Sequence, residues 1–298
     1  MSVSHTFFIR SFAKLNLFLY VVSKRQDGYH NLYSLMTCID LHDELYADFN
    51  AKDISVSCDH PDVPEDESNL AFKAAGLFYD SLKRPLSEKK RISIHINKKI
   101  PPGGGLGGGS SNAAAVLTAL NKYYHYPFTQ EELMHLGLCL GADVPFFIFG
   151  SPALAKGVGE KLIKIPALPS YYLLLCDPGV AASTAQVYKN FNLTPDFNLT
   201  FGEKYTIHTG FDKLIRGQEQ NIEEILHNDL EESACRLYPE INKTKEEMEF
   251  LLHKKVHMTG SGSSLFALFS DRKNSEKGYE LLLNKWAGSK KKIFLSSF

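Results

Sequence analysis

The stretch from Pro101 to Ala115, PPGGGLGGGSSNAAA, contains the residue types that bind an anion through the backbone. Six glycines within seven residues leave no Cβ between the backbone and a ligand, and they permit left-handed backbone angles. Ser110, Ser111 and Asn112 are suited to cap a helix, and the alanines that follow favour one. A glycine loop that leads into a helix presents unpaired N–H groups and the positive end of the helix dipole, so we expect a phosphate site here.

Other roles for this glycine run fit the sequence less well. A flexible linker is disfavoured, because the strand-like run RISIHI (91–96) precedes the glycines and an amphipathic helical pattern follows them. A Walker A loop requires a lysine after the glycines, and none follows. The dinucleotide fingerprint G-x-G-x-x-G fits, as it would fit any glycine-rich run, but the nearest acidic residues, Glu131 and Glu132, fall at a predicted helix start.

Two charged side chains in apolar surroundings are candidates for chemistry. Asp143 lies between Ala142 and the apolar run VPFFIF, where a carboxylate requires a charged or hydrogen-bonding partner. A helix N-cap before Pro145 would also explain it. Lys14 lies in the middle of an apolar strand, which is unusual for a charge without a use, although an outward-facing lysine is the simpler alternative. Asn16 follows two residues later, so both side chains share a face of the strand.

The composition is that of a globular protein with one large or two ordinary domains. The chain has 298 residues, of which 44% are hydrophobic and 22% charged. The net charge of -1 argues against nucleic acid as a partner, and no apolar run approaches the ~18 residues of a membrane span. Five cysteines without a C-x-x-C pair favour free thiols over disulfides or a zinc site. We therefore expect a cytoplasmic protein.

The elements that must position these residues mix strands and helices without a strict βαβ rhythm, which favours an α+β fold. Residues 7–50 read as strands with a turn at Asp27-Gly28, and residues 196–222 read as an irregular, variable surface. Further predicted elements are a strand over 91–96, a helix over 66–82 opened by Asp66 or Ser68, helices over 129–140, 223–236 and 240–254, a strand in YYLLLCDPG, a strand–turn–strand in VHMTGSGSSLFALFS, a helix to Trp286, and a last strand in KKIFLSSF.

Three glycine-containing signatures resemble the GHMP kinase superfamily, whose members are small-molecule kinases without a Walker A motif. They are AKLNLFLYVVSKRQDGYH (13–30), IPPGGGLGGGSSNAA (100–114) with GADVPFF (141–147), and MTGSGSSLFALF (258–269). The NDLE segment (228–231) and the DPG…STAQVY stretch (177–188) also fit. The resemblance implies an α+β fold of two domains with the active site in the cleft between them. The N-terminal, ATP-binding domain would span 1–153 and the C-terminal domain 154–298, and the last strand could return to the first domain.

The resemblance also implies an activity, the ATP-dependent phosphorylation of a tertiary hydroxyl, with Mg²⁺ expected beside ATP. The combination of A-K-x-N with D-G-Y-H is most similar to the members that act on a small-molecule substrate, a cytidine diphosphate-linked methylerythritol. By this resemblance Asp143 accepts or orients the hydroxyl proton, and Lys14 lies close to it and to the phosphoryl group. No carboxylate pair with metal-ligand spacing stands out, so we expect phosphates and water to hold the metal ion. A monomer and a homodimer are both compatible with the sequence.

The implied binding residues fall into three groups. Tyr29 and Tyr188 would sandwich the cytosine ring, His30 would meet its polar edge, and Asn16, Thr184 and Asp143 would complete the substrate site. Asn69 and Lys98 are implied for the adenine side. The implied phosphate-binding residues are Pro101, Gly103, Gly104, Gly105, Leu106, Gly107, Gly108, Gly109, Ser110 and Ser111.

Structural alternatives stay open for several of these residues. Tyr29 and His30 follow a turn and fit an ordinary surface, while Asn69 fits a helix start and Lys98 a solvated lysine. The GSGSS turn (260–264) either closes against the phosphate loop or the acceptor, or is only a tight hairpin. Alternative functions are a kinase of homoserine, mevalonate or a sugar, a catalytically dead nucleotide-binding regulator, and a dinucleotide-dependent oxidoreductase. The D-G-Y-H motif argues against the first, and the Lys14–Asp143 pair against the second.

Overall fold

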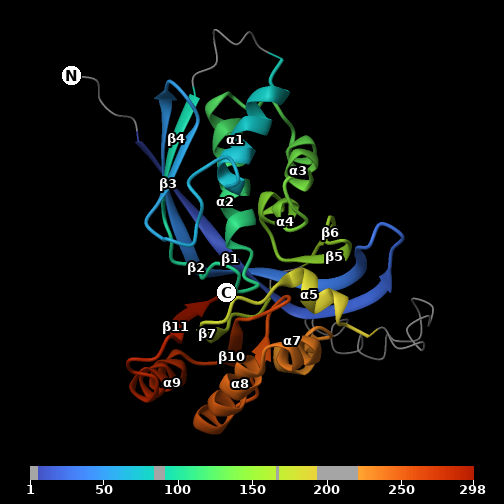
Figure 1. Ribbon diagram of the computed structural model, residues 1–298, viewed down its shortest axis with the longest axis vertical. Coiled ribbons are helices and arrows are strands. Elements are labelled where there is room, and N and C mark those ends of the chain that lie inside the picture. The colour runs from blue at the N-terminus through green and yellow to red at the C-terminus, as the bar shows by residue number, and fades with distance from the viewer. Residues whose placement is uncertain (1–5, 84–90, 166–167, 193–220) are drawn as a thin grey trace. The chain divides into compact units, whose positions relative to one another are not determined.

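The computed structural model describes residues 6–83, 91–165, 168–192 and 221–298 (Figure 1). The chain divides into two compact units, and neither is continuous in sequence. Strands β1 (Thr6–Lys24) and β2 (His30–Ala51) each begin in one unit and end in the other. Unit 1 comprises Met1–Ala13, Leu41–Pro102 and Gly107–Ser151, and unit 2 comprises Lys14–Asp40, Gly103–Leu106 and Pro152–Phe298.

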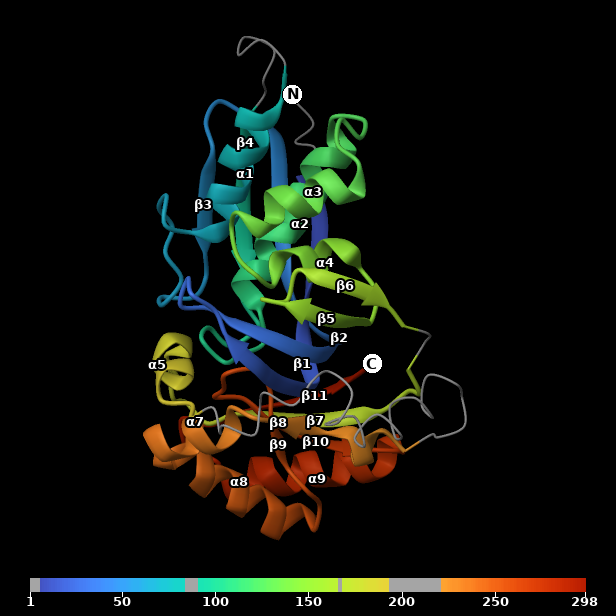
Figure 2. The ribbon, with the colours of Figure 1, turned by 90° about the vertical axis from the view of Figure 1, so that its right-hand side faces the viewer.

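Unit 1 is a sheet covered on one face by helices. Its strands are ordered β3 (Ser55–Cys58), β4 (Arg91–Asn97), β2 and β1. The alternation in RISIHI predicts β4 correctly, because Ile92, Ile94 and Ile96 are buried against the helices. Figures 1 and 2 show these helices on the same side of the sheet. They are α1 (Leu70–Ser81), α2 (Gly108–Tyr123), α3 (Gln130–Leu138) and α4 (Val144–Phe149).

Unit 2 contains the hairpin end of β1 and β2 and a second, antiparallel sheet. The predicted Asp27-Gly28 turn is confirmed, with Gly28 at φ +87° and the Arg25 N–H donating to the Tyr29 carbonyl at 2.8 Å. β5 (Ala153–Gly157) pairs with β2, β6 (Lys161–Lys164) with β5, and β8 (His227–Asn228) runs parallel to β1. The second sheet is ordered β11 (Lys292–Ser297), β7 (Tyr172–Asp177), β10 (Leu265–Phe269) and β9 (His257–Met258).

Helices pack on the second sheet and complete the core of unit 2. Leu174 of β7 and Leu265 of β10 are fully buried in one cluster with Met248 and Leu282 from two of these helices. Figures 1 and 2 show α7, α8 and α9 along the same side of this sheet. The helical elements are α5 (Thr184–Lys189), the short 3₁₀ helix η4 (Ile222–Ile225), α7 (Glu231–Leu237), α8 (Pro239–Leu252) and α9 (Arg272–Lys285).

The predicted α+β class is confirmed, as are the strands at β1, β2, β4 and β7 and the strand–turn–strand at β9 and β10. The final strand is also found, and it pairs with β7 inside unit 2. The division at residue 153 stays a prediction. Of the stretch 196–222 that we expected to be irregular, residues 196–220 lie outside the described residues.

Three helix starts differ from the prediction, two of them because of a local side-chain hydrogen bond. α1 begins after Asn69, since the Asp66 carboxylate accepts the Ser68 N–H in a turn of its own. α2 begins at Gly108 with Gly107 as N-cap, so the two serines and Asn112 lie within its first turns and do not cap it. The expected helix over 223–236 is wrong in its first half, because Asn228 Oδ1 accepts the Leu230 N–H at 3.0 Å and delays α7.

Candidate functional site

The loop of residues 101–107, called the glycine loop below, leads directly into α2. The first hydrogen bond of the helix joins the Ser111 N–H to the Gly107 carbonyl at 2.8 Å. The N–H groups of residues 108–110 precede this bond and have no acceptor within the helix. Together with the positive end of the helix dipole, these N–H groups in the first turn of a 16-residue helix have the arrangement that an anion site requires, and the phosphate site itself stays a prediction.

The segment GADVP adjoins this helix start inside unit 1. A Cβ placed on Gly141 would lie 3.6 Å from Ser110 Oγ, and the Val144 N–H donates to the Gly141 carbonyl at 3.1 Å. This turn brings Asp143 to the N-cap position of α4, as the structural alternative required. Its carboxylate makes no capping hydrogen bond to that helix, however, so capping does not account for the acid.

Lys14 and Asn16 form a buried polar pair in unit 2. Their relative exposures are 4% and 5%, so the alternative of an outward-facing lysine is wrong. Lys14 Nζ donates to Asn16 Oδ1 at 2.5 Å, which confirms that both side chains share one face of β1. Asn16 Nδ2 donates to Ser34 Oγ at 2.8 Å. Burying an ammonium group costs free energy unless it is paired or hydrogen-bonded. A lysine kept in a strand interior therefore indicates a functional role.

The turn of residues 259–264 packs against the glycine loop in unit 2. The Ser264 N–H donates to the Gly104 carbonyl at 3.1 Å, and a Cβ placed on Gly105 would lie only 2.6 Å from the Thr259 carbonyl oxygen. Thr259 Oγ1 also accepts the Asn16 N–H at 3.0 Å. A Cβ on Gly260 would lie 3.2 Å from Lys14 Nζ. The GSGSS turn therefore closes against the loop, and it also lies against Lys14.

The NDLE segment holds this turn in place, a role that sequence reasoning missed. Asn228 Nδ2 donates to the carbonyls of Met258 and Gly260, both at 2.8 Å. Glu231 accepts the Met258 N–H at 3.0 Å, and Asp229 accepts the Val21 N–H at 2.8 Å. The motif was visible in the sequence, but a single sequence does not show which backbone groups its amide would reach.

The residues implied for cytosine binding lie on two elements of unit 2. The His30 and Tyr188 rings stack with centroids 5.2 Å apart, and Thr184 Oγ1 lies 2.8 Å from Ser261 Oγ. Tyr29 keeps 64% of its surface exposed. Burial and the neighbouring Lys24 lower the pKa of His30, so its imidazole is neutral at pH 7. A neutral imidazole offers one donor and one acceptor, as the edge of a base requires.

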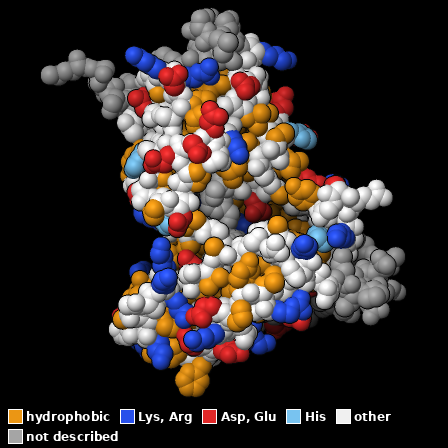
Figure 3. All heavy atoms as spheres, viewed as in Figure 1, with side chains coloured by type: hydrophobic (Ala, Val, Ile, Leu, Met, Phe, Trp, Pro, Cys, Tyr) orange, Lys and Arg blue, Asp and Glu red, His pale blue; other side chains and the backbone are white. Residues whose placement is uncertain are grey.

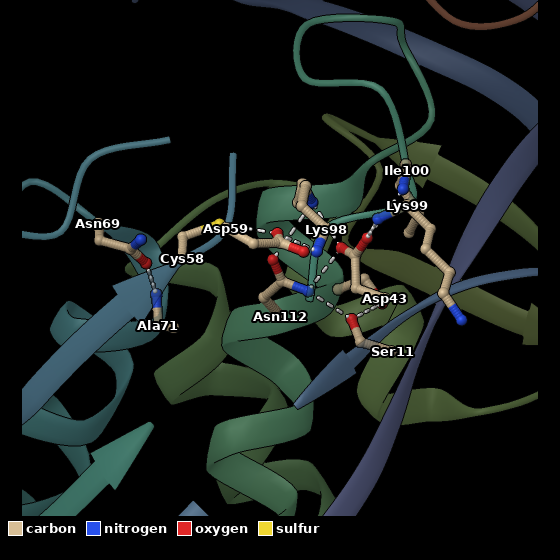
Figure 4. Close-up of polar contacts among 11 residues, drawn as sticks. Ser11, Asp43, Cys58, Asp59, Asn69, Ala71, Lys98, Lys99, Ile100 and Asn112 are labelled. Atoms are coloured by element: carbon tan, nitrogen blue, oxygen red, sulfur yellow. Dashed lines mark hydrogen bonds and ion pairs between the residues drawn. The ribbon is translucent and has the colours of Figure 1, made fainter. Parts of the chain in front are cut away.

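Neither residue implied for the adenine side is a solvated surface residue. Asn69 caps α1, because its Oδ1 accepts the Ala71 N–H at 2.8 Å (Figure 4). Its Nδ2 donates to the Pro64 carbonyl at 2.6 Å. The alternative of a helix-start residue is therefore confirmed. Lys98 is buried, and its Nζ contacts the carboxylate of Asp43 at 2.5 Å. The alternative of a solvated Lys98 is wrong.

The described residues were also compared with what a metal site, a membrane span or a strongly charged surface would require. Among them no group of three or more His, Cys, Asp or Glu side chains is arranged to hold a metal ion. The helices of the described part of the chain include none that is long and apolar enough to cross a membrane. On the face drawn in Figure 3, basic and acidic side chains are interspersed, so neither sign dominates that face.

Known proteins match this chain in sequence and in structure. Residues 69–151 match the GHMP kinases N terminal domain, and residues 211–287 match the GHMP kinases C terminal domain. A 4-diphosphocytidyl-2-C-methyl-D-erythritol kinase from Clostridium botulinum (strain Alaska E43) is 39% identical over 282 residues, covering 93% of this chain and 96% of the relative. The kinase of the same name from Geobacter sp. (strain M21) is 40% identical over 263 residues, covering 87% and 88%.

Solved structures of kinases also match this chain. The crystal structure of a 4-(cytidine 5'-diphospho)-2C-methyl-D-erythritol kinase matches with a TM-score of 0.76 and 32% identity over 98% of both chains. A homoserine kinase from Cytophaga hutchinsonii matches with a TM-score of 0.72 over 99% of this chain and 96% of its own. At 17% identity the latter is a likeness of fold alone.

Proposed function

Because the chain belongs to the GHMP kinases, and among them to the 4-diphosphocytidyl-2-C-methyl-D-erythritol kinases, we propose that it transfers the γ-phosphoryl group of ATP to the 2-hydroxyl of 4-diphosphocytidyl-2-C-methyl-D-erythritol. The products are the 2-phosphate and ADP, in the non-mevalonate route to isoprenoid precursors. The observation that carries the proposal is the open first turn of α2, with Ser110 beside the GAD turn that bears Asp143. The enzyme works in the cytoplasm as a monomer or a homodimer.

Phosphoryl transfer asks a protein mainly for positioning and for stabilisation of charge. The N–H groups of residues 108–110 and the hydroxyl of Ser110 bind the phosphates of ATP. Asp143 accepts or orients the proton of the attacking hydroxyl, for which a carboxylate is suited. Lys14, a buried cation, stabilises the negative charge that develops on the transferring group.

A magnesium ion accompanies ATP in this proposal. Mg²⁺ retains several waters and binds through one or two carboxylates plus the phosphates of the nucleotide, so a cluster of protein ligands is not required. Asp143 lies in the GAD turn that adjoins Ser110, and its carboxylate is suited to contact the hydrated ion. The ion would neutralise phosphate charge, while the residues named above orient the acceptor hydroxyl.

The cytidine end of the substrate gives the proposal its specificity. Tyr29 and Tyr188 offer aromatic faces on which a base can stack, and stacking alone accepts any base. The neutral His30 selects cytosine through its polar edge, and Thr184 and Asn16 contact the rest of the substrate. A site built to hydrogen-bond a polar group strongly rejects an analogue that lacks it.

The test is ADP release from MgATP with the cytidyl substrate, compared with mevalonate, homoserine and galactose. Turnover on the cytidyl substrate alone is expected. Turnover on another alcohol would discard the roles of Tyr29, His30 and Tyr188. Turnover on none, with ATP still bound, would favour a nucleotide-binding regulator.

Two substitutions test the reacting centre. Asp143→Asn keeps the shape of the side chain and is expected to lower kcat by about 10²–10⁴-fold, the usual contribution of a general base. Lys14→Met is expected to have an effect of similar size, with ADP binding retained in both variants. The matched controls are Asp271→Asn, where asparagine caps α9 as well as aspartate does, and Lys285→Met on the same helix. Near-normal turnover in either test variant removes that residue from the mechanism.

A further inference from the structure

A completely buried acid binds residues that flank the glycine loop and has no part in the chemistry proposed above. Asp43 of β2 is 0% exposed, and four donors surround its carboxylate (Figure 4). Oδ1 accepts the backbone N–H groups of Lys99 and Ile100, both at 2.8 Å. Oδ2 accepts Lys98 Nζ at 2.5 Å and Asn112 Nδ2 at 2.9 Å.

These four donors come from both sides of the glycine loop. Lys98, Lys99 and Ile100 immediately precede the loop, and Asn112 lies in the second turn of the helix that follows it. A loop rich in glycine has many conformations to lose when it is ordered, because glycine loses more backbone freedom than any other residue. One carboxylate that binds both flanks fixes the distance between the ends of the loop.

The orientation of Asn112 extends this connection to the helix start. Its Nδ2 must face the Asp43 carboxylate, and its Oδ1 accepts Lys98 Nζ at 3.3 Å, so the amide has one possible orientation. Nδ2 also donates to Ser11 Oγ at 2.8 Å, and Ser11 Oγ in turn donates to Ser111 Oγ at 2.7 Å. The Ser111 hydroxyl is therefore held toward the interior, with the residue 3% exposed. Its half-exposed neighbour Ser110 is the hydroxyl better placed to meet a ligand.

The Asp43–Lys98 pair also brings a cation close to the helix start. A Cβ placed on Gly108, the first residue of α2, would lie 2.8 Å from Lys98 Nζ. A buried ion pair gives little net stability, because desolvation offsets the attraction of the charges. Keeping such a pair under the first turn of a phosphate-binding helix is better explained by the geometry that it imposes on the turn.

We propose that Asp43 is a positioning residue for the nucleotide: its carboxylate fixes both flanks of the glycine loop and so presets the N–H groups that bind phosphate. Asn112 connects Asp43 to the helix that follows the loop, and Lys98 connects it to the strand that precedes the loop. The proposal rests on the proposed kinase function for the identity of the anion, a nucleoside polyphosphate. It assigns Lys98 to the phosphate side, through Asp43, and not to direct contact between its ammonium and adenine.

The test compares Asp43→Asn and Asn112→Ala with the wild-type enzyme and with Asp59→Asn. Asp43→Asn keeps the shape of the side chain but sets an NH₂ group against the donors from Lys98 and Asn112. Asn112→Ala removes the helix-side bond to Asp43 together with the bonds of Asn112 to Ser11 and Lys98. It keeps the Asp43–Lys98 ion pair, and alanine favours a helix, so we expect it to be the milder of the two variants. Asp59 is an exposed acid that accepts the Lys98 backbone N–H at 2.7 Å, which makes it a control on the same strand end.

The measurements are the Kd of MgADP by calorimetry, the KM values of ATP and of the cytidyl substrate, and hydrogen exchange of residues 101–112. Asp43→Asn and Asn112→Ala are expected to weaken MgADP and raise the KM of ATP at least tenfold. The KM of the cytidyl substrate should stay within twofold, exchange at 107–112 should be faster, and Asp59→Asn should match the wild type.

A merely structural role predicts a different pattern. Both KM values would then stay normal in the folded fraction, with only the yield of active enzyme reduced, and that result overturns the proposal. Calorimetry with MgADP needs no acceptor substrate. It therefore tests the role of Asp43 separately from the proposed kinase function. A wild-type protein that binds no MgADP refutes the kinase function itself, whereas equal binding by wild type and Asn112→Ala refutes only the role of Asp43.

Discussion

Two glycines of the glycine loop offer a controlled test of its contact with the 259–264 turn. Gly103 and Gly105 have nearly the same left-handed backbone, with φ of +73° and +76°. A Cβ added at Gly103 meets nothing within 4 Å, whereas at Gly105 it would lie 2.6 Å from the Thr259 carbonyl and 2.9 Å from that of Gly262. Gly103→Ala and Gly105→Ala therefore share the backbone strain and differ only in the clash.

The shared strain is about 1–2 kcal/mol for an alanine in the left-handed region. The clash adds about 1–3 kcal/mol, typical of overpacking, because the nearest neighbours of a Cβ on Gly105 are backbone atoms that cannot rotate away. If the loop leaves the turn instead, it loses the Ser264–Gly104 hydrogen bond, worth about 0.5–1.5 kcal/mol. By either route the penalty of Gly105→Ala exceeds that of Gly103→Ala by at least about 0.5 kcal/mol.

The assay is the Kd of MgADP together with the free energy of unfolding in urea, because the penalty divides between binding and stability. For each variant the loss in binding free energy and the loss in unfolding free energy are added. The two sums should differ by about 0.5–3 kcal/mol, which is about 2- to 150-fold in Kd if the whole difference falls on binding. Equal losses in the two variants would show that the loop does not rest on the turn in solution. The conclusion that the 259–264 turn closes against the glycine loop would then be wrong.

Four further results are expected. Because burial and Lys24 lower the pKa of His30 below 6.5, we expect the KM of the cytidyl substrate to rise as the pH falls below that value, and a His30→Gln variant to lose this dependence. The free energy of unfolding in urea should be lower at pH 5 than at pH 7. As the pH falls, His30 is protonated in the unfolded chain before it is protonated in the folded protein, because folding lowers its pKa. Asn228→Asp replaces two donors by a carboxylate that faces two carbonyls, so it should lower the free energy of unfolding by about 1–3 kcal/mol and reduce kcat. Iodoacetamide at pH 8 should label the exposed Cys139 before Cys176, whose thiol pKa is raised by burial, as mass spectrometry of the peptides would show.

Local chemistry accounts for the parts of the fold and site that could be predicted. The glycine run followed by alanines predicts a loop and a helix because both depend on neighbouring residues, and Thr129 predicts α3 through a capping box with Glu132. The shared face of Lys14 and Asn16 follows from the two-residue period of a strand. Each of these predictions needed only a few consecutive residues.

The parts that could not be predicted depend on residues far apart in the chain. Asp43 looks like an ordinary acid on a strand, and only the fold shows that it binds the N–H groups of Lys99 and Ile100. The pairing of β8 with β1 is likewise invisible locally, and it turned a predicted helix into a two-residue strand around Asn228. The assignment of Asp143 came from family resemblance, because spacing alone favoured an N-cap as strongly.

The discontinuous units have a consequence for how the protein is made. Asn16 is bonded to Thr259, which lies 243 positions later, and Val21 to Asp229, 208 positions later. At about 5–20 residues per second, a ribosome needs roughly 12 to 50 s to supply the partner of Asn16 after Asn16 itself has been synthesised. During that interval the apolar face of residues 14–40 lacks the elements that bury it in unit 2. Unit 1 is complete once Ser151 has been synthesised, whereas residues 14–40 wait for the later elements of unit 2. Transient protection of this first hairpin by a chaperone would therefore raise the yield.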